Sequence, residues 1–308
     1  MSGDLPFRNR KNRGKGTCQR KNGIGLQRLG ACAIIWSIVQ ADRRPHRMWL
    51  AAVVLQERNT HMGQTILLNG MVLSAMPIGD YDKRLVVLTR ERGKITVFAR
   101  GARRPNSSLL ASTNPFAFGE FELFEGKTAY NACKISVRNY FRELTEDVEM
   151  ACYGFYFLEL ADYYAVENVE AKDMCNLLYV SLRALMKPVF SNRLVRRIYE
   201  LRMFVLAGEY PNLFSCVSCG AKEHLHTFHI GRSGMLCDGC VAVIGGGIEV
   251  DGSTLYTMQY IVSAPLEKLY SFQVTTEVLS VLERVMDTCL GRYTDREFHS
   301  LELIGSFH

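Results

Sequence analysis

Residues 64–141 alternate short apolar and β-branched runs with turn-forming residues, which is typical of a β-rich region. We expect five strands, at residues 65–76, 84–89, 94–99, 120–123 and 131–137. The turn at residues 90–93 joins the second strand to the third and ends in a glycine that can adopt a positive φ, which suits a hairpin. Five short strands in so short a region predict a small closed barrel.

From residue 145 the apolar positions recur with a helical period. We expect helices at residues 148–165, 171–186, 191–207, 253–263 and 276–290. Thr145 is expected to cap the first helix, Ser191 the third, and Gly291 to end the last. The predicted fold class is therefore α+β and multi-domain. An N-terminal β-barrel at residues 62–141 precedes an all-helical C-terminal domain at 142–308.

A cysteine-rich insert at residues 212–245 interrupts the helical pattern. Of ten cysteines, four form two Cys-x-x-Cys pairs with 17 residues between them: Cys216, Cys219, Cys237 and Cys240. Two thiolates two residues apart reach one ion from a tight turn, so two such turns supply four tetrahedral ligands. We expect a structural Zn²⁺ in a four-cysteine ribbon, with Gly220 and Gly239 allowing the sharp turns.

Other interpretations of these cysteines are weaker. Two disulfides would need an oxidising compartment, and a redox Cys-x-x-Cys would be single and set in a βαβ unit. His224, His226 or His229 could replace one cysteine ligand, but with four well-placed thiols the simpler expectation is that the histidines lie in solvent or beside the ligands. Phe228 and Leu236 are expected to form a small core between the two turns.

Positive charge is concentrated at the start of the chain. Residues 1–61 hold 12 Lys and Arg against 3 Asp and Glu, a net +9. We expect a disordered leader, or upstream sequence read from a start placed too early, with Met62 as a natural start; a basic nucleic-acid-binding arm is the alternative. The signal-peptide resemblance of this segment fails at the cleavage region. No apolar run approaches the ~20 residues that a membrane span needs.

The barrel region is also positive, with 11 Lys and Arg against 6 Asp and Glu in residues 62–141. Its cationic residues cluster at predicted strand ends and loops: Lys83, Arg84, Arg90, Arg92, Lys94, Arg100, Arg103 and Arg104. Such a cluster neutralises phosphates and gives salt-dependent, sequence-tolerant binding of nucleic acid. The neighbouring Tyr81, Phe98, Phe116 and Phe118 could stack on bases, although a solvated surface and core aromatics are the plainer alternative.

Residues 142–308 are acidic, with 14 Lys and Arg against 22 Asp and Glu, and yet one helix there carries a basic set. Arg193, Arg196 and Arg197 share one face, which could receive an acidic peptide or DNA. Intrahelical pairing, such as Arg196 with Glu200, is the alternative. The chain has no P-loop, no His-Glu-x-x-His motif and no complete nucleophile elbow, which favours a binding protein over an enzyme.

Three blocks of sequence resemble a known family. Residues 71–85 (MVLSAMPIGDYDKRL), 89–94 (TRERGK) and 98–105 (FARGARRP) are similar to the N-terminal domain of the bacterial RecO family of recombination mediators. The order of barrel, helices and inserted four-cysteine module matches this family as well, and the resemblance covers roughly residues 62–300. It implies an OB-fold barrel, a helical domain and, as in many members, a zinc ribbon.

The resemblance also implies a function, which is DNA repair in the RecF pathway by a protein that is not an enzyme. Family members bind single- and double-stranded DNA, anneal strands coated by single-stranded DNA-binding protein, recognise the C-terminal tail of that protein, and act with RecR to load RecA. It implies a cytoplasmic, nucleoid-associated bacterial protein. Two other classes stay open: a zinc-ribbon protein-interaction module without DNA-binding activity, and an enzyme of nucleic-acid metabolism with an unrecognised site.

Overall fold

The computed structural model describes residues 64–306. The predictions for residues 1–61, a disordered leader, a misplaced start or a basic arm, lie outside the described residues. Within the described part, no helix combines the length and the apolar character that crossing a membrane requires.

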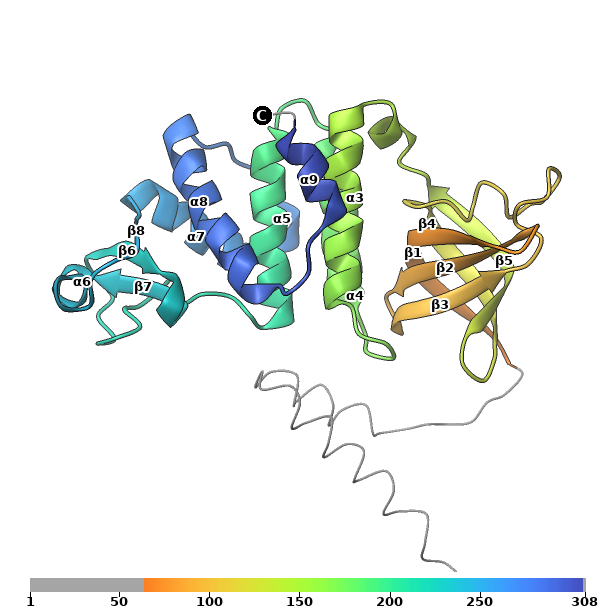
Figure 1. Ribbon diagram of the computed structural model, residues 1–308, viewed down its shortest axis with the longest axis horizontal. Coiled ribbons are helices and arrows are strands. Elements are labelled where there is room, and N and C mark those ends of the chain that lie inside the picture. The colour runs from red at the N-terminus through yellow and green to blue at the C-terminus, as the bar shows by residue number, and fades with distance from the viewer. Residues whose placement is uncertain (1–63, 307–308) are drawn as a thin grey trace, which may run out of the picture. The chain divides into compact units, whose positions relative to one another are not determined.

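Five strands form a closed barrel, as the sequence pattern predicts (Figure 1). They are β1 Thr65–Ile78, β2 Asp82–Thr89, β3 Gly93–Ala99, β4 Phe118–Glu125 and β5 Tyr130–Asn139. The order around the barrel is β1-β2-β3-β5-β4, and β3 pairs with β5 in parallel while the other pairs are antiparallel. This five-stranded barrel is OB-like, so the expected barrel fold is confirmed.

The long strand β1 closes the barrel by pairing with both β2 and β4. Gly70 lies where they meet, opposite Thr89 of β2 and Gly119 of β4. A Cβ atom at Gly70 would lie 2.3 Å from the backbone oxygen of Leu88. The glycine that interrupts the apolar run is therefore required by close approach of two backbones.

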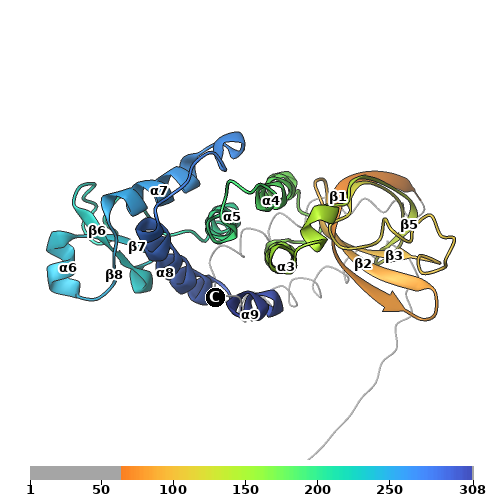
Figure 2. The same cartoon turned by 90° about the horizontal axis from the view of Figure 1, so that it is seen from above.

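The rest of the chain is mainly helical. The longer helices are α3 Val148–Tyr164, α4 Lys172–Leu185, α5 Asn192–Ala207, α7 Gly252–Ser263 and α8 Thr276–Tyr293. Single 3₁₀ turns occur at Arg142–Thr145 and Leu266–Lys268. A last helix, α9 His299–Gly305, was not predicted; it lies beside α3 (Figure 2).

The predicted helix ends are right in one case and wrong in two. Ser191 caps α5, because its side chain accepts a hydrogen bond from the Leu194 N–H. Thr145 does not cap α3; Asp147 does, by accepting from the Met150 N–H. Gly291 does not end α8, which continues to Tyr293, because packing of the helix outweighs the weak helix propensity of one glycine.

The apolar interior consists of two clusters. One fills the barrel, around side chains such as Val87 and Phe121. The larger one lies among the helices and also includes Met71 from the barrel and Phe228 and Leu236 from the cysteine-rich insert. The insert therefore packs its small core onto the helices rather than standing alone.

The β2–β3 hairpin is fastened to the α3–α4 loop by backbone hydrogen bonds. Lys94 N donates to Val166 O at 3.2 Å, Asn168 N to Arg92 O at 3.0 Å and Ala171 N to Arg90 O at 2.9 Å. We call these three bonds the hairpin clamp. They satisfy backbone groups that would otherwise be unpaired at the turn.

Candidate metal centre and nucleic-acid interface

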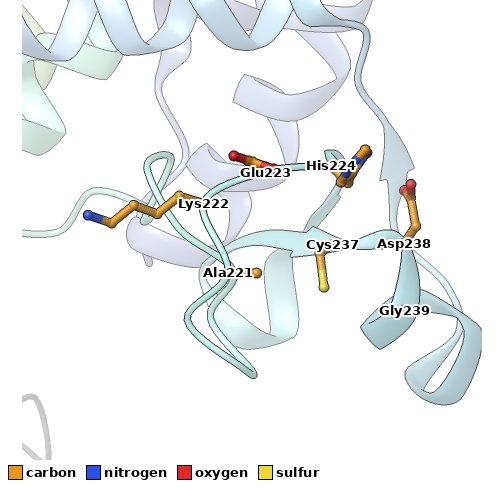
Figure 3. Close-up of a pocket in the computed structure, with 7 residues that line it drawn as sticks. All are labelled: Ala221, Lys222, Glu223, His224, Cys237, Asp238 and Gly239. Carbon is orange, nitrogen blue, oxygen red and sulfur yellow. The ribbon is translucent and has the colours of Figure 1, made fainter.

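The four paired cysteines come together in a small module between α5 and α7. Its sheet has the order β7-β6-β8, with β6 Leu225–His229, β7 Gly234–Cys237 and β8 Ile248–Glu249. Cys216 and Cys219 lie in the loop before β6. Cys237 ends β7 (Figure 3). Cys240 lies in the short helix α6 Asp238–Ile244 that follows.

The geometry of the four sulfurs fits a metal ion. Their Sγ atoms all lie within 4.8 Å of one another, and Cys219 Sγ is 3.6 Å from Cys237 Sγ. Zinc–sulfur bonds of about 2.3 Å in a tetrahedron place the sulfurs roughly 3.8 Å apart, so the cluster needs little adjustment. Burial disfavours the charged form of Cys216. Backbone hydrogen bonds at Cys219, Cys237 and Ser218 outweigh that effect and lower its pKa to about 6, which favours the thiolate that binds metal.

The two glycines of the module have different roles. Gly220 has a φ of +80° just after the first cysteine pair, as expected for a sharp turn. Gly239 does not have the expected role: it lies in α6 without a positive φ, and a Cβ atom there would meet nothing within 4 Å. The second turn is formed by a strand leading directly into a helix, which needs no glycine.

No histidine belongs to the cysteine cluster found among residues 64–306. His226 Nδ1 lies 3.0 Å from Asp238 Oδ1 on the surface of the module, and His224 and His226 have their ring centroids 6.3 Å apart. His229 Nδ1 is buried without a hydrogen-bond partner.

The eight basic residues of the barrel form two groups, because strands β2 and β3 run antiparallel. Their register pairs Lys83 with Ala99 at one end and Thr89 with Gly93 at the other. The first end, which we call the basic edge, carries five of the eight predicted residues: Lys83, Arg84, Arg100, Arg103 and Arg104. The three others lie at the hairpin end.

The basic edge is held together by contacts between loops. Arg103 N donates to Tyr81 O at 2.8 Å, and its guanidinium donates to Gly79 O at 3.1 Å. Lys83 Nζ donates to Thr113 Oγ1 and Asn114 Oδ1. Burial lowers the pKa of Lys83, and the nearby charge of Arg103 lowers it further.

Exposed apolar groups lie among these cations. Met76, Arg84 and Phe98 face one another across β1, β2 and β3, so they form one row on the outer surface. Met76 is 62% exposed and Phe98 36%. Tyr81 is also exposed, and the guanidinium of Arg104 lies 5.3 Å from its ring centroid. Sequence reasoning missed Met76, because only the strand register places it beside Arg84.

The hairpin-end cations make contacts within the fold. Arg90 donates to Asn176 Oδ1 at 2.8 Å, Arg92 is 3.1 Å from Glu125 Oε1, and Lys94 Nζ donates to Asp162 O at 2.6 Å. These side chains join the barrel to α3 and α4 or join strands to each other.

Two of the four aromatic residues considered for stacking, Phe116 and Phe118, are buried. Phe116 packs on Phe155, and Phe118 on Tyr179. Phe116 and Phe118 are therefore core residues and not stacking surfaces, which leaves Tyr81 and Phe98 as the exposed pair.

The three arginines of α5 do share one face, and that face is turned to α8. Arg193 Nε donates to Glu283 Oε1 at 2.8 Å. Arg196 Nε donates to Glu200 Oε1 at 2.8 Å, which is the intrahelical pair suggested as an alternative. Arg197 lies 2.7 Å from Asp287 Oδ1 and 3.0 Å from Glu200 Oε2.

Glu200 is the centre of this network and is fully buried. It also accepts a hydrogen bond from the Tyr156 hydroxyl at 2.7 Å. Burial by itself would raise the pKa of Glu200, but the charges of Arg196 and Arg197 outweigh burial and lower it. The network thus holds α3, α5 and α8 together around an ionised carboxylate.

Comparison with known proteins agrees with this architecture. The family model described as Recombination protein O N terminal matches residues 62–141, and the one described as Recombination protein O C terminal matches residues 145–302. DNA repair protein RecO of Alkaliphilus metalliredigens is 30% identical over 236 residues, which cover 76% of this chain and 96% of the relative.

Two further relatives have the same name. DNA repair protein RecO of Acetivibrio thermocellus is 28% identical over 238 residues, covering 77% of this chain and 94% of the relative. That of Symbiobacterium thermophilum is 28% identical over 240 residues, covering 77% and 95%. With its OB-like barrel, its helical region and a cysteine cluster that could bind zinc, the chain belongs to the RecO family, which indicates a role in DNA repair and recombination.

Proposed function

We propose that this protein binds DNA through the basic edge of its barrel and anneals complementary strands during recombinational repair. The observation that supports this most directly is the row of Met76, Arg84 and Phe98, in which a cation is flanked by exposed apolar side chains. The side chains of Arg84 and Arg100 make no ion pair or hydrogen bond with another of residues 64–306, so their charge is available to phosphates. Contacts of this type position a strand without reading its sequence.

The aromatic groups add a preference for single strands. Bases that are not paired can stack on Phe98 and Tyr81, and such stacking contributes about 1–3 kcal/mol per base. A duplex offers only its phosphates to the same surface. The basic edge would thus hold two strands by lowering their mutual repulsion while leaving their base edges free to pair.

The test is oligonucleotide binding and annealing over a salt series. Arg103→Ala combined with Arg104→Ala should weaken binding equally on unrelated sequences and flatten the slope of log affinity against log salt by roughly one or two. Arg284→Ala combined with Arg292→Ala is the matched control, because it removes the same charge from exposed positions on α8. Equal effects of the two double variants would show that net charge rather than the basic edge controls binding.

Phe98→Ala separates stacking from charge. It should weaken single-stranded DNA binding by about tenfold and duplex binding much less, because only unpaired bases stack. No DNA binding at all would favour a module that binds only protein. Salt-independent DNA binding would argue against neutralisation of phosphates by the basic edge.

We further propose that the ion held by the four cysteines is Zn²⁺ with a structural role. Four thiolates complete the tetrahedron, so no coordination position remains for substrate. Purified protein should contain one zinc per chain, released when the thiols are blocked. Protein that folds fully after zinc removal would contradict a structural role.

The partners proposed from the family are RecR, the C-terminal tail of single-stranded DNA-binding protein and, indirectly, RecA. Of the three α5 arginines, Arg193 keeps 43% of its side chain exposed, against 13% for Arg196 and 5% for Arg197. Arg193→Ala is therefore the variant that tests this face as the tail site. Unchanged affinity for a tail peptide would remove α5 from consideration.

A further inference from the structure

Two histidines and an aspartate lie together on the surface of the cysteine module, outside the cysteine cluster. His226 Nδ1 is 3.0 Å from Asp238 Oδ1, and the His224 and His226 ring centroids are 6.3 Å apart with planes at 75°. We propose that His224 and His226 bind a second divalent transition-metal ion, with Asp238 as the residue that positions His226.

The module brings these residues together by its backbone. His224 directly precedes β6, and its carbonyl oxygen accepts a hydrogen bond from the Asp238 N–H at 3.2 Å. The next pair along, Leu225 and Cys237, is in register across β6 and β7. His224 has a φ of +56°, and the pairing of β6 with β7 shifts register between Leu225 and Thr227, so this local bend, and not strand alternation, sets how the two rings lie.

The distance between the rings suits one shared ion. Metal–nitrogen bonds of 2.0–2.1 Å in a tetrahedral site place two imidazole centroids roughly 5 Å apart. The observed 6.3 Å would close by about 1 Å through rotation of side chains that are exposed. His226 has 53% of its side chain exposed, so no packing opposes this movement.

The pairing of His226 with Asp238 is the arrangement found behind metal-bound histidines. A carboxylate that accepts the Nδ1–H of an imidazole fixes the tautomer in which Nε2 carries the free lone pair. His226 Nε2 would then be one ligand and a His224 nitrogen the other. Imidazole ligands select Zn²⁺, Ni²⁺ or Co²⁺ over Mg²⁺ and Ca²⁺, which prefer oxygen.

The second site is separate from the first. Figure 3 shows the Asp238 carboxylate and the Cys237 sulfur pointing in opposite directions from neighbouring positions of the chain. The Lys222 side chain extends away from His224, so its ammonium does not oppose a cation there. His224 and Asp238 line an open pocket of about 600 Å³, to which Cys237 also contributes. Because His226 is exposed, coordination positions that the protein leaves free would face solvent, so the ion would exchange readily.

The experiment titrates the full chain, holding one zinc per chain, with Ni²⁺ in a calorimeter, so that the four cysteines are already occupied and the histidine site is free. We expect one Ni²⁺ per chain in the micromolar range. His224→Asn and His226→Asn should each weaken binding at least tenfold, and Asp238→Asn by about tenfold, since loss of such a carboxylate typically costs 10–100-fold in metal affinity. His299→Asn is the matched control, because His299 is an exposed histidine on α9.

A second readout avoids reliance on variants. In the wild-type protein, paramagnetic Ni²⁺ should broaden the NMR signals of the His224 and His226 rings before that of His299. Zinc content of one per chain in every variant shows that the cysteine cluster is intact. Three outcomes would each overturn the proposal. They are absence of Ni²⁺ binding in the micromolar range, equal Ni²⁺ affinity of both histidine variants and wild type, and broadening that begins at another histidine.

Discussion

Substitution of Gly93 by alanine should loosen the hairpin clamp between the barrel and the α3–α4 loop. Gly93 has a φ of +61°, and a Cβ atom there would lie 2.2 Å from Val166 O and 2.5 Å from Val169 O. Both neighbours are backbone atoms and cannot rotate away. Ordinary contact begins at 3.4 Å, so the loop would have to retreat by about 1 Å.

The expected loss of stability has two parts. Placing alanine in a left-handed conformation costs about 1–2 kcal/mol. Retreat of the loop also breaks or lengthens the clamp, whose three backbone hydrogen bonds each contribute about 0.5–1.5 kcal/mol net. Loss of two of them adds about 1–3 kcal/mol, which brings the total for Gly93→Ala to about 2–5 kcal/mol.

Gly79→Ala is a matched control in the β1–β2 turn of the same barrel. Gly79 has a φ of +53°, but a Cβ atom there would meet nothing within 4 Å. Gly79→Ala should therefore lower the free energy of unfolding only by the conformational part, about 1–2 kcal/mol.

The assay is calorimetric unfolding of zinc-loaded protein. For a protein of this size 1 kcal/mol corresponds to a Tm change of about 2–4 °C. Gly93→Ala loses about 1–3 kcal/mol more than Gly79→Ala and should therefore melt roughly 2–12 °C below it. Equal melting temperatures would refute the reasoning, because they would show that the clamp contributes nothing beyond the glycine conformation.

Three further predictions follow from the helical part and the cysteines. Because Arg196 and Arg197 lower the pKa of Glu200, its ionised form stabilises the fold above about pH 4.5, and this contribution is lost as the pH falls through the lowered value. Glu200→Gln should thus lower the free energy of unfolding by about 3–5 kcal/mol at neutral pH, and its difference in stability from wild type should become smaller in acid. Denaturant titrations that give the same difference in stability at every pH would contradict this. Cys216→Ser should lower the Tm of the helices as well as that of the cysteine module, because the two share a core. Calorimetry that shows the module unfolding separately, with the Tm of the helices unchanged, would contradict this. Under native conditions a thiol reagent should modify the exposed Cys133 well before Cys175 and Cys289, whose pKa values burial raises to about 12. Mass spectrometry of peptides gives the order of modification, and earlier modification of Cys175 or Cys289 would contradict the prediction.

The sequence by itself determined the five barrel strands, the five longer helices and the grouping of the four cysteines. Strand alternation, the change to a helical period, the capping residue Ser191 and the spacing of the cysteine pairs are local signals, which depend on neighbours a few residues apart. The similarity to the RecO family rests on blocks of the same kind. Helix ends were less predictable, as Thr145 and Gly291 show, since tertiary packing competes with weak local preferences.

Only the tertiary structure decided what each charged residue does. Arg84 and Arg92 look alike in the sequence, but the antiparallel register puts Arg84 on the exposed basic edge and Arg92 against Glu125. In the same way, Arg193 and Arg197 meet Glu283 and Asp287 because α8 packs on α5, whereas the pair of Arg196 with Glu200 lies within α5. A charge has the same local signature whether it is solvated or paired, and its partner is set by contacts between residues far apart in the chain.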